Sequence, residues 1–455
     1  MKRTTAQWRA LDRATHLHPF TDLSDHAAKG GRIISRAEHV YVYDSDGKQL
    51  LDGMSGLWCT SLGYSQQRIK DAITAQLAEL PFYNSFFKCS NEPAVELAGL
   101  LKEVTPPQFN HFFFTNSGSE ANDTNIRLVH RYFDLLDKPE KKIIIARHNA
   151  YHGSTIAGGS LGGMAAMHKQ YLGLPYVEHV AQPYWFREGG AMDPESFGVH
   201  AAKSLADRID ALGADRVAAF IAEPIQGAGG VIIPPESYWP EIARICRERD
   251  VLLISDEVIC GFGRTGRWFG CETYGYEPDL ITFAKAVTNG YQPLGGVAVG
   301  DRIADVMLGG GGEFAHGFTY SGHPVCAAAA VATLSIFREE GVVERTARDL
   351  APYFATRWAS LADHPIVGET RTKGMLAAVE LVRDRPGREP LAPQGAGAFF
   401  CRDAAISGGL MVRAIGDAIV SAPPLVCSHE EIDLLVDRVR AALDATARHY
   451  GINTH

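Results

Sequence analysis

The stretch Leu280-Ile281-Thr282-Phe283-Ala284-Lys285-Ala286 joins a short apolar run to a lysine. A run of this length and composition predicts a buried strand. Upstream, Val251-Leu252-Leu253-Ile254-Ser255 has the same character and is followed by Asp256-Glu257-Val258. Taken singly, Lys285 is better explained as a solvated strand end and Asp256 as an ordinary cap. Together they predict a sheet with an amine and a carboxylate at its edge.

A third segment favours a shared role for these two residues. Residues 111–115 predict another strand, and the turn Asn116-Ser117-Gly118-Ser119-Glu120-Ala121-Asn122 opens a helical pattern. Free N–H groups at a helix N-terminus bind phosphate, and Ser119 adds a hydroxyl. Pyridoxal phosphate (PLP) needs such a phosphate cradle. It also needs an amine that condenses with its aldehyde, here Lys285, and a carboxylate that keeps its ring nitrogen protonated, here Asp256.

Between about residues 60 and 320, short β-rich runs alternate with helical patterns. This alternation predicts an α/β fold in which helices pack on a mostly parallel sheet. Ligands of such sheets bind beyond the carboxyl ends of the strands, where the candidate residues fall. The predicted strands are residues 112–115, 143–146, 217–222, 251–255, 280–284 and 296–299.

The remaining segments predict a smaller α/β domain built from both termini. Residues 40–44 alternate and meet a Ser45-Asp46-Gly47 turn, which is a hairpin signal. Residues 375–381 and 410–414 predict strands, and Ser428-His429-Glu430-Glu431 predicts a capping box. Gly309 to Gly312 predict a flexible surface loop. We expect residues 1–60 to form the N-terminal part of the small domain, 61–325 the large cofactor-binding domain, and 326–455 the C-terminal small domain.

Length and composition restrict the function further. The chain has 455 residues, 46% of them hydrophobic and 21% charged, as in ordinary globular enzymes with two or three domains. A net charge of −9 argues against nucleic acid as a partner. We find no signal-peptide core and no stretch that could span a bilayer, and expect a cytoplasmic protein without membrane contact. The eight scattered cysteines and the histidines lack ligand spacing, so no metal site is predicted.

One motif suggests a different class of enzyme. Gly261-Phe262-Gly263-Arg264-Thr265-Gly266 fits Gly-x-Gly-x-x-Gly after a strand, and Asp279 lies near the distance of a ribose-binding acid. A dinucleotide-binding dehydrogenase is therefore an alternative. In that class the motif opens a helix, whereas residues 267–278 are broken by glycines and a proline and show no helical period. We expect a loop here.

The motifs together resemble those of the class III aminotransferases, or ω-aminotransferases, which are PLP enzymes of fold type I. The resemblance runs from about Phe20 to the C-terminal helix. A nearer likeness, to amine–pyruvate and putrescine (polyamine)–pyruvate aminotransferases, lies in residues 57–59 and 80–87. The wider resemblance is carried by residues 116–122, Tyr151-His152-Gly153, Glu223-Pro224-Ile225-Gln226-Gly227, residues 256–266, the lysine segment and residues 316–324.

The resemblance implies roles for individual residues. Gly118 and Ser119 would hold the phosphate, Tyr151 and Val258 would lie on opposite faces of the ring, and His152 and Glu223 would belong to the cofactor's polar surroundings. Thr319 would reach the partner subunit's phosphate, and Phe86 would form a wall of the neighbouring site, so a homodimer is the minimum active unit and a tetramer is left open. Trp58 and Tyr151 would line the amine slot, and Arg413 would bind the keto acid's carboxylate.

Some of these residues have structural explanations as well. Tyr151 could be an aromatic residue at the sheet edge, Glu223 could form a salt bridge, and Asp417 could neutralise Arg413 in an otherwise apolar strand.

The implied reaction is PLP-dependent amino transfer from a carboxylate-free amine to pyruvate, with Lys285 moving the proton. Many class III enzymes that use 2-oxoglutarate carry a glutamate where this chain has Ala228, and its absence favours small keto acids. A PLP-dependent aminomutase or decarboxylase on the same scaffold is the alternative.

Overall fold

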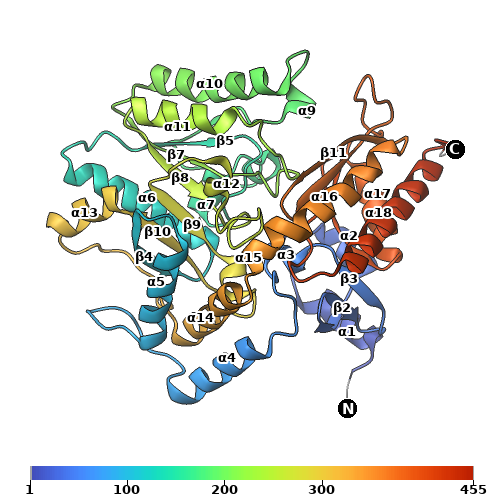
Figure 1. Cartoon of the computed structure of the whole chain (residues 1–455), viewed down its shortest axis with the longest axis horizontal. Coiled ribbons are helices and arrows are strands. Elements are labelled where there is room, and N and C mark those ends of the chain that lie inside the picture. Colours follow the sequence, from blue (N-terminus) through green and yellow to red (C-terminus); the bar gives the residue numbers. More distant parts are fainter. Residues whose placement is uncertain (1–2, 454–455) are drawn as a thin grey trace.

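A seven-stranded sheet lies at the centre of the computed structural model, which describes residues 3–453 (Figure 1). The strand order is β4-β10-β9-β8-β7-β5-β6. Strand β10 is antiparallel to both of its neighbours, and the other six strands run parallel to one another. The strands are β4 (Phe109–Thr115), β5 (Ile143–Arg147), β6 (Val177–Val180), β7 (Val217–Ala222), β8 (Leu252–Asp256), β9 (Leu280–Phe283) and β10 (Gly295–Gly300).

All six strands predicted for this region are present, which confirms the α/β architecture. The edge strand β6 was not predicted, because its sequence Val-Glu-His-Val is short and half polar. The reversal of β10 was not predicted either. Only residues 284–294 connect β9 to β10, and that connection is too short for a helical crossover, so the chain turns back beside the strand it has just left.

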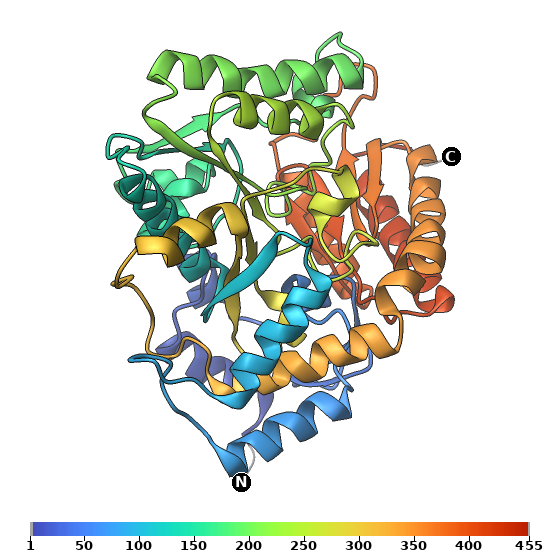
Figure 2. The same ribbon diagram turned by 60° about the vertical axis from the view of Figure 1, so that its left-hand side comes forward.

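Helices cover both faces of the sheet, and the strand residues alternate between the two resulting cores. Leu252 and Ile254 of β8 pack in a cluster with α6 and α13, whereas Leu253 belongs to the cluster that contains α10, α11 and α14. Figure 2 shows α10 and α11 side by side. The longer helices are α4 (Gln67–Glu79), α5 (Glu92–Val104), α6 (Gly118–Leu135), α10 (Pro194–Leu212), α11 (Tyr238–Glu248), α13 (Asp301–Gly310), α14 (Pro324–Glu339), α16 (Ala351–Ala359), α17 (Ala396–Ser407) and α18 (His429–His449).

The remaining helices either precede the first strand, as α1 does, or are short segments between the elements above. They are α1 (Thr5–Thr15), α2 (Leu23–Lys29), α3 (Ser55–Trp58), α7 (Ile156–Leu161), α8 (Ala165–His168), α9 (Trp185–Glu188), α12 (Gly270–Tyr274) and α15 (Val342–Arg345), with single turns η1 (Lys285–Thr288), η2 (Thr346–Leu350) and η3 (Ser360–Asp363).

There are also two four-stranded sheets, and the first of them combines strands from opposite ends of the chain. One has the order β1-β2-β3-β13 and the other β11-β12-β15-β14. In Figure 1 the N-terminal strands lie beneath the C-terminal helices α17 and α18. The strands are β1 (Ile34–Glu38), β2 (Tyr41–Asp44), β3 (Gln49–Asp52), β11 (Val367–Lys373), β12 (Leu376–Leu381), β13 (Leu410–Met411), β14 (Arg413–Ile415) and β15 (Ala418–Ser421).

The structure corrects the single strand that the sequence predicted at residues 410–414. Leu410 and Met411 pair with β3, whereas Arg413 to Ile415 pair with β15 in the other sheet. The chain changes sheets at the buried residue Val412. Apart from Arg413, the residues on both sides of Val412 are apolar, so the hydrophobic pattern does not reveal that the chain passes from one sheet to the other. Its consequence is that Arg413 begins a strand at the edge of a second sheet.

Other local predictions can be checked directly. The hairpin β2–β3 and the capping box of Ser428 and Glu431 are confirmed. The loop predicted at Gly309 to Gly312 is partly wrong, because α13 continues through Gly310. Residues 1–2 and 454–455 of the expected domain ranges lie outside the described part of the chain.

The glycine motif at residues 261–266 lies in turns and is followed by only the five-residue helix α12. Phe262, Gly263 and Gly266 have positive φ, so the segment bends back on itself instead of entering a long helix. The Arg264 side chain is buried and donates to the Pro423 carbonyl and to the hydroxyls of Ser55 and Ser61. The motif thus holds the segment around Trp58 in place, in agreement with the expected loop.

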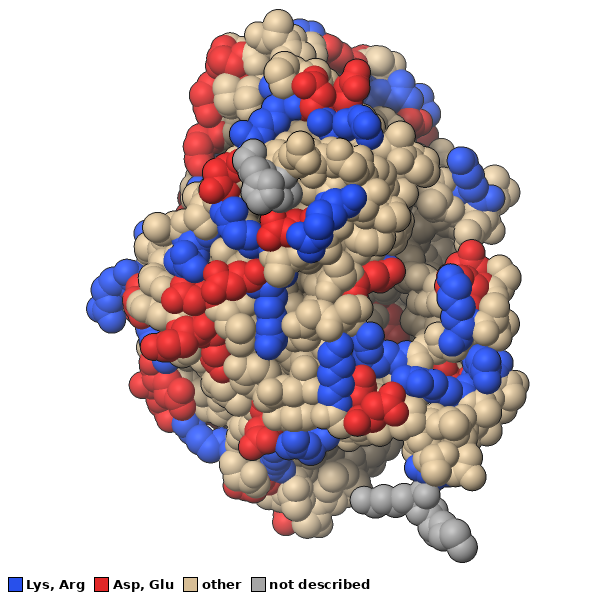
Figure 3. Space-filling view, turned by 90° about the vertical axis from the view of Figure 1, so that its right-hand side faces the viewer, with Lys and Arg blue, Asp and Glu red and all other residues tan. Residues whose placement is uncertain are grey.

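Within residues 3–453, no helix is both long enough and apolar enough to cross a membrane. On the face drawn in Figure 3, acidic and basic side chains are interspersed, so neither sign forms a continuous field among the described atoms there.

Candidate active site

A cavity of about 440 Å³ lies at the carboxyl ends of β8 and β9, against the N-terminus of α6. Most of the residues singled out in the sequence meet in it, although they are spread over almost 170 positions. Its walls include Cys59, Gly118, Ser119, Asn122, Tyr151, His152, Glu223, Asp256, Val258, Lys285 and Leu294.

Lys285 follows β9 in a left-handed conformation, with φ 54°. A positive φ is uncommon for a residue with a long side chain, and strain of this kind collects at functional sites. Burial lowers the pKa of the Lys285 amine, although Cys59 and Asp256 oppose that shift. A lower pKa leaves more of the amine neutral near neutral pH, which a nucleophile and proton carrier requires.

Asp256 is held rigidly at the end of β8. Its Oδ2 lies 2.7 Å from Nδ1 of His152 and accepts from Nδ2 of Asn122 at 2.8 Å. Its Oδ1 accepts from the backbone N–H of Val258 at 3.2 Å. These three contacts fix the position of the carboxylate at the cavity wall.

Asn122 is a residue of this site to which the sequence analysis gave no role of its own. Its amide also donates to the His152 carbonyl at 2.8 Å, and its Oδ1 accepts from Thr282 at 2.8 Å. Thr282 lies on β9, three residues before Lys285. Asn122 therefore links α6, β8 and β9. The available signal was its position one helical turn after Ser119 in the quoted motif.

The N-terminus of α6 is shaped for close approach by a ligand. Ser117 caps the helix by accepting from the N–H of Glu120. A Cβ on Gly118 would lie 2.8 Å from Val258, and one on Gly153 would lie 2.6 Å from Oγ of Ser119. Both positions therefore require glycine. The first turn of the helix and the Ser119 hydroxyl are left at the cavity wall, as a phosphate would require.

Glu223 connects two loops beneath the cavity. Its carboxylate accepts from the N–H of Tyr151 at 3.1 Å and from that of Gly227 at 2.8 Å. Burial raises the pKa of Glu223. Among the described residues its carboxylate has no salt bridge, so the structural alternative considered for it is wrong; its hydrogen bonds hold the backbone on which Tyr151 is placed.

Trp58 lies near two cations. The Nζ of Lys285 is 5.3 Å from its ring centre, and Cζ of Arg413 is 5.5 Å from it. Within residues 3–453 no carboxylate forms an ion pair with Arg413, and burial lowers the pKa of its guanidinium. The expectation that Asp417 could neutralise Arg413 is wrong, because Asp417 pairs with Arg187 at 3.4 Å and accepts from the N–H of Gly395.

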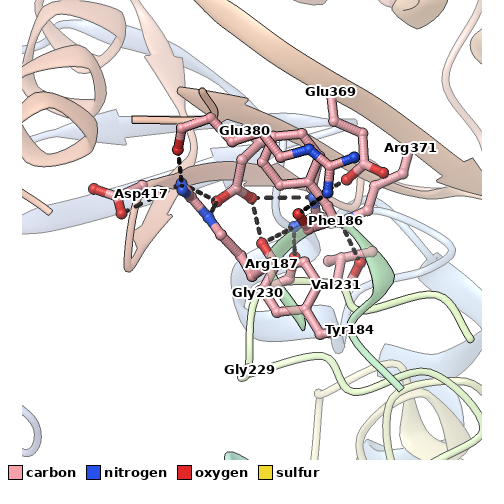
Figure 4. Close-up of polar contacts among 12 residues, drawn as sticks. Tyr184, Phe186, Arg187, Gly229, Gly230, Val231, Glu369, Arg371, Glu380 and Asp417 are labelled. Carbon is pink, nitrogen blue, oxygen red and sulfur yellow. Dashed lines mark hydrogen bonds and ion pairs between the residues drawn. The ribbon is translucent and has the colours of Figure 1, made fainter. Parts of the chain in front are cut away.

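A second set of buried charges centres on Arg371 and Glu380 (Figure 4). Arg371 on β11 pairs with Glu369 at 2.6 Å and Glu380 at 3.1 Å. Its remaining donors reach the carbonyls of Gly230 and Val231 at 2.7 and 2.8 Å. These carbonyls belong to the loop that follows Gly227, so Arg371 fastens this loop to the four-stranded sheet.

Arg187 extends the same network toward the β14–β15 turn. It pairs with Glu380 at 2.7 Å and with Asp417 at 3.4 Å, and Tyr184 donates to Glu380. Asp417 lies four residues after Arg413. The network therefore joins the segment around Tyr184, the loop at residues 227–231 and the hairpin that carries Arg413.

Five of the residues predicted for the site, Trp58 among them, lie outside the cavity wall. Thr319 is exposed in a turn, and Phe86 lines a separate depression of about 550 Å³ beside Gly317. Ala228 is buried in the loop that Arg371 holds. Arg413 reaches toward Trp58, at the side of the cavity.

The fold and this cavity define a class of protein, the PLP-dependent enzymes of fold type I. Comparison with known sequences identifies the family. The family model Aminotransferase class-III matches residues 24–443, and the chain belongs to the class III aminotransferases.

Individual relatives are similar over nearly the whole chain. A putrescine–pyruvate aminotransferase of Pseudomonas aeruginosa is 52% identical, over 97% of each chain. A chloroplastic gamma-aminobutyrate transaminase of Solanum lycopersicum is 44% identical, over 91% of this chain and 81% of the relative. The ω-transaminase of Pseudomonas jessenii, solved in complex with pyridoxamine phosphate, superposes with a TM-score of 0.94 at 41% identity, covering 97% of this chain and 99% of that one.

The residues present suit PLP. The cavity contains an amine of lowered pKa, a fixed carboxylate and a helix N-terminus with a hydroxyl, and the glycines at 118 and 153 leave room that a Cβ would fill. The buried Nε2 of His152 has no hydrogen-bond partner in the described structure. Class III aminotransferases use PLP, and this enzyme is a PLP-dependent aminotransferase.

Proposed function

We propose that the enzyme transfers the amino group of a primary amine lacking an α-carboxylate, such as a diamine or polyamine, to pyruvate. The products are an aldehyde or ketone and alanine. The observation that carries this proposal is the placement of Arg413. It is a half-buried cation without a carboxylate partner in the described chain, beside the same tryptophan as Lys285. The putrescine–pyruvate specificity of the bacterial relative supports the choice of substrates.

The bound cofactor would supply an electron sink for the carbon from which a proton is removed. We assign the proton transfer to Nζ of Lys285, which would take the proton from the substrate carbon and later return it. Asp256 would hold the proton on the ring nitrogen, and His152 and Asn122 would keep its carboxylate in place. The first turn of α6 with Ser119 would bind the phosphate. Val258 and Tyr151 would contact the two faces of the ring.

In the second half of the reaction, Arg413 would bind the carboxylate of pyruvate through its planar guanidinium. Pyruvate is small enough to fit beside Trp58. Ala228 presents no carboxylate that could hold Arg413 when an amine occupies the slot, and the arginine would then turn away. Trp58 and Tyr151 would line the apolar part of the amine slot. Lack of an acidic group at 228 favours pyruvate over dicarboxylic keto acids.

We further propose that the active unit is a homodimer. Phe87 is 92% exposed, and Tyr320 is 56% exposed, and large apolar side chains in such positions mark contact surfaces. Thr319 would reach the partner's phosphate and Phe86 the partner's amine slot. A complementation experiment tests this: Lys285→Ala and Thr319→Glu chains, each inactive alone, should regain activity when mixed dimers form, since one site then has both native residues. Mixed dimers without activity would contradict the shared site.

The division into residues 1–60, 61–325 and 326–455 is also proposed. It is supported by the central sheet, which uses only residues 109–300, and by the pairing of β3 with β13. We also propose a cytoplasmic location, because all eight cysteines are free thiols and free thiols are typical of reducing compartments.

A panel of amines with two acceptors tests the proposed reaction. Alanine should form from putrescine or another carboxylate-free amine with pyruvate, and much more slowly with 2-oxoglutarate as acceptor. Amine alone should change the absorption of the bound cofactor, and pyruvate should reverse the change. An aminomutase or decarboxylase would act without the acceptor. Failure of every amine to give alanine would overturn the proposal.

A further inference from the structure

The N-terminal segment brings together a carboxylate and several imidazoles outside the cavity. Asp12 lies on α1, His16 caps the end of that helix, and His18 follows in the next turn. The Oδ1 of Asp12 is 3.3 Å from Nδ1 of His16 and 2.9 Å from Nε2 of His18. The ligand-type atoms of the three residues all lie within 4.8 Å of one another.

We propose that Asp12, His16 and His18 form a binding site for a transition-metal ion, with Zn²⁺ as the best match. Zinc binds nitrogen and oxygen at about 2.0–2.1 Å in a tetrahedron, which separates neighbouring ligand atoms by about 3.3 Å. Two of the observed spacings, 3.3 and 2.9 Å from Asp12, are close to that value, and the nitrogens of the two histidines lie within 4.8 Å of each other. Two imidazoles and one carboxylate are a ligand set that zinc accepts, with the remaining position open to water.

A buried histidine gives a second, independent indication. His26 on α2 is 9% exposed, and its Nε2 points at Oδ2 of Asp12 from 3.2 Å. Neither atom has a hydrogen bond of acceptable geometry in the described structure. A Cβ on Gly31 would lie 3.1 Å from the His26 ring, so the backbone packs closely against this side of the group. His26 is placed to hold the second oxygen of a metal-binding carboxylate, as outer partners of metal ligands do.

Hydrogen bonding alone explains the group less well. One carboxylate faces three imidazoles, and the pair formed by Asp12 Oδ2 and His26 Nε2 stays unsatisfied. The histidines were given no ligand spacing in the sequence, so the site was not predicted.

The site adjoins the mouth of the cofactor cavity. Phe20, two residues after His18, is 68% exposed and has φ 48°, yet its ring lies 6.0 Å from that of Tyr151, edge-on. Tyr151 is part of the cavity wall. An ion bound to His16 and His18 would fix the chain just before Phe20 and hold this ring beside Tyr151. Metal binding would then restrict entry of bulky amines more than entry of small ones.

Binding can be measured on untagged holoenzyme after dialysis against a chelator. Titration with Zn²⁺, in competition with a chromogenic chelator, should show one ion per chain for the native protein. That binding should be lost in His16→Asn and His18→Asn. His429→Asn is a matched control, because His429 pairs with the single carboxylate of Asp349 at 3.0 Å with no other histidine in the pair, and its zinc binding should stay native. Native stoichiometry in the His18 variant, or no binding by the native protein, would overturn the site.

A kinetic comparison tests the link to Phe20 separately. Zn²⁺ should raise the Michaelis constant for a bulky amine relative to a small diamine in the native enzyme. The response should disappear in Phe20→Ala, while zinc binding persists there. Thermal melting checks that each variant is folded. If zinc binds at one ion per chain but leaves the ratio of the two Michaelis constants unchanged, the proposed effect on amine entry is wrong.

Discussion

Arg371 and Arg413 lie on the two edge strands of one four-stranded sheet, β11 and β14, and have opposite surroundings. Arg371 has two carboxylates and two backbone carbonyls as partners. Arg413 has no ion pair within the described chain and lies beside the ring of Trp58. The buried charge of Arg371 is balanced inside the protein, whereas the charge of the half-buried Arg413 is available to a ligand.

The pKa directions follow from this difference. Burial acts to lower the pKa of both arginines. For Arg371 the neighbouring Tyr184, Glu380 and Glu369 reverse the effect, and its pKa is raised overall. For Arg413 nothing of comparable size opposes burial, and its pKa is lowered. A buried charge without a partner is costly, so its retention in a cleft favours a functional role.

Lys285 is a third cation in this comparison. Like Arg413 it has no ion-pair partner among the described residues, and its removal should have the largest effect. Lys285→Ala is expected to abolish turnover, because no neighbouring amine can carry the proton. Folding should be retained, since relieving a desolvated charge is not destabilising. Amine consumption and thermal melting measure the two effects. Borohydride reduction of the native enzyme followed by peptide mapping is the check, and a pyridoxyl label on another lysine would contradict the assignment.

Removing a partner from the balanced network should affect stability instead. Arg371→Met leaves Glu380 with Arg187 alone and breaks the salt bridge of Glu369, and we expect a loss of about 3–5 kcal/mol in the free energy of unfolding. Both half-reactions should decline by the same factor among the folded molecules. Urea unfolding measures the first effect. Arg440→Met, which breaks an exposed pair with Asp363 at 2.7 Å, is the control and should change stability little.

The network should also respond to acid in a defined direction. Burial would raise the pKa of Glu380, but Arg371, Tyr184 and Arg187 outweigh it and the pKa lies below its ordinary value of 4.5. The contribution of Glu380 to the free energy of unfolding is therefore complete above that pH and is lost as the pH falls through the folded-state pKa.

The outcome that would contradict the role of Arg371 concerns the variant. If Arg371→Met unfolds at the same urea concentration as the native enzyme, Arg371 does not stabilise the fold.

Asp256→Asn extends the comparison from the cations to the carboxylate in the cavity. The hydrogen bonds around position 256 can persist, but the charge opposite the ring nitrogen is lost. We expect a loss of roughly 3 kcal/mol in transition-state stabilisation, or about a hundredfold in rate, in both half-reactions. Stopped-flow absorption of each half measures it. A near-native rate would show that Asp256 has only a structural role.

Ala228→Glu should give Arg413 an ion-pair partner, as Arg371 already has. The loop at 228 borders β14, since a Cβ on Gly230 would lie 3.9 Å from Ile415. A carboxylate there would bind Arg413 and crowd the slot, which slows the pyruvate half-reaction and the use of bulky amines modestly, by about tenfold or less. Ala228→Gln is the matched uncharged control. Unchanged kinetics with the glutamate would mean that residue 228 does not face Arg413.

The sequence was informative where short motifs end buried strands. The strands at 251–255 and 280–284, the turn at 116–122 and the cavity that joins them could be predicted, because parallel strands deliver their carboxyl ends to one edge. The reversal of β10 and the change of sheets at Val412 could not. Both depend on which strand lies alongside, and the local hydrophobic pattern is the same in either arrangement.

Polar partners were harder to predict than positions. Asn122 lies in the motif at residues 116–122, but its hydrogen-bond partners Asp256 and Thr282 are 134 and 160 residues away in the sequence. Asp417 was a reasonable partner for Arg413, because the two are close in sequence. The structure instead pairs Asp417 with Arg187, which lies 230 residues from it. Long-range pairing of charges is set by packing of the two sheets, which composition and periodicity do not encode.

Single-turnover kinetics of Arg413→Ala, beside Arg371→Met, tests the central claim most directly. The amine half-reaction and the pyruvate half-reaction are followed separately by the absorption of the bound cofactor. The account predicts that Arg413→Ala slows the pyruvate half by about thirtyfold, for a loss of roughly 2 kcal/mol, and leaves the amine half nearly unchanged. Arg371→Met should leave the ratio of the two rates as in the native enzyme. Equal slowing of both halves by Arg413→Ala would contradict the account and make Arg413 a structural residue.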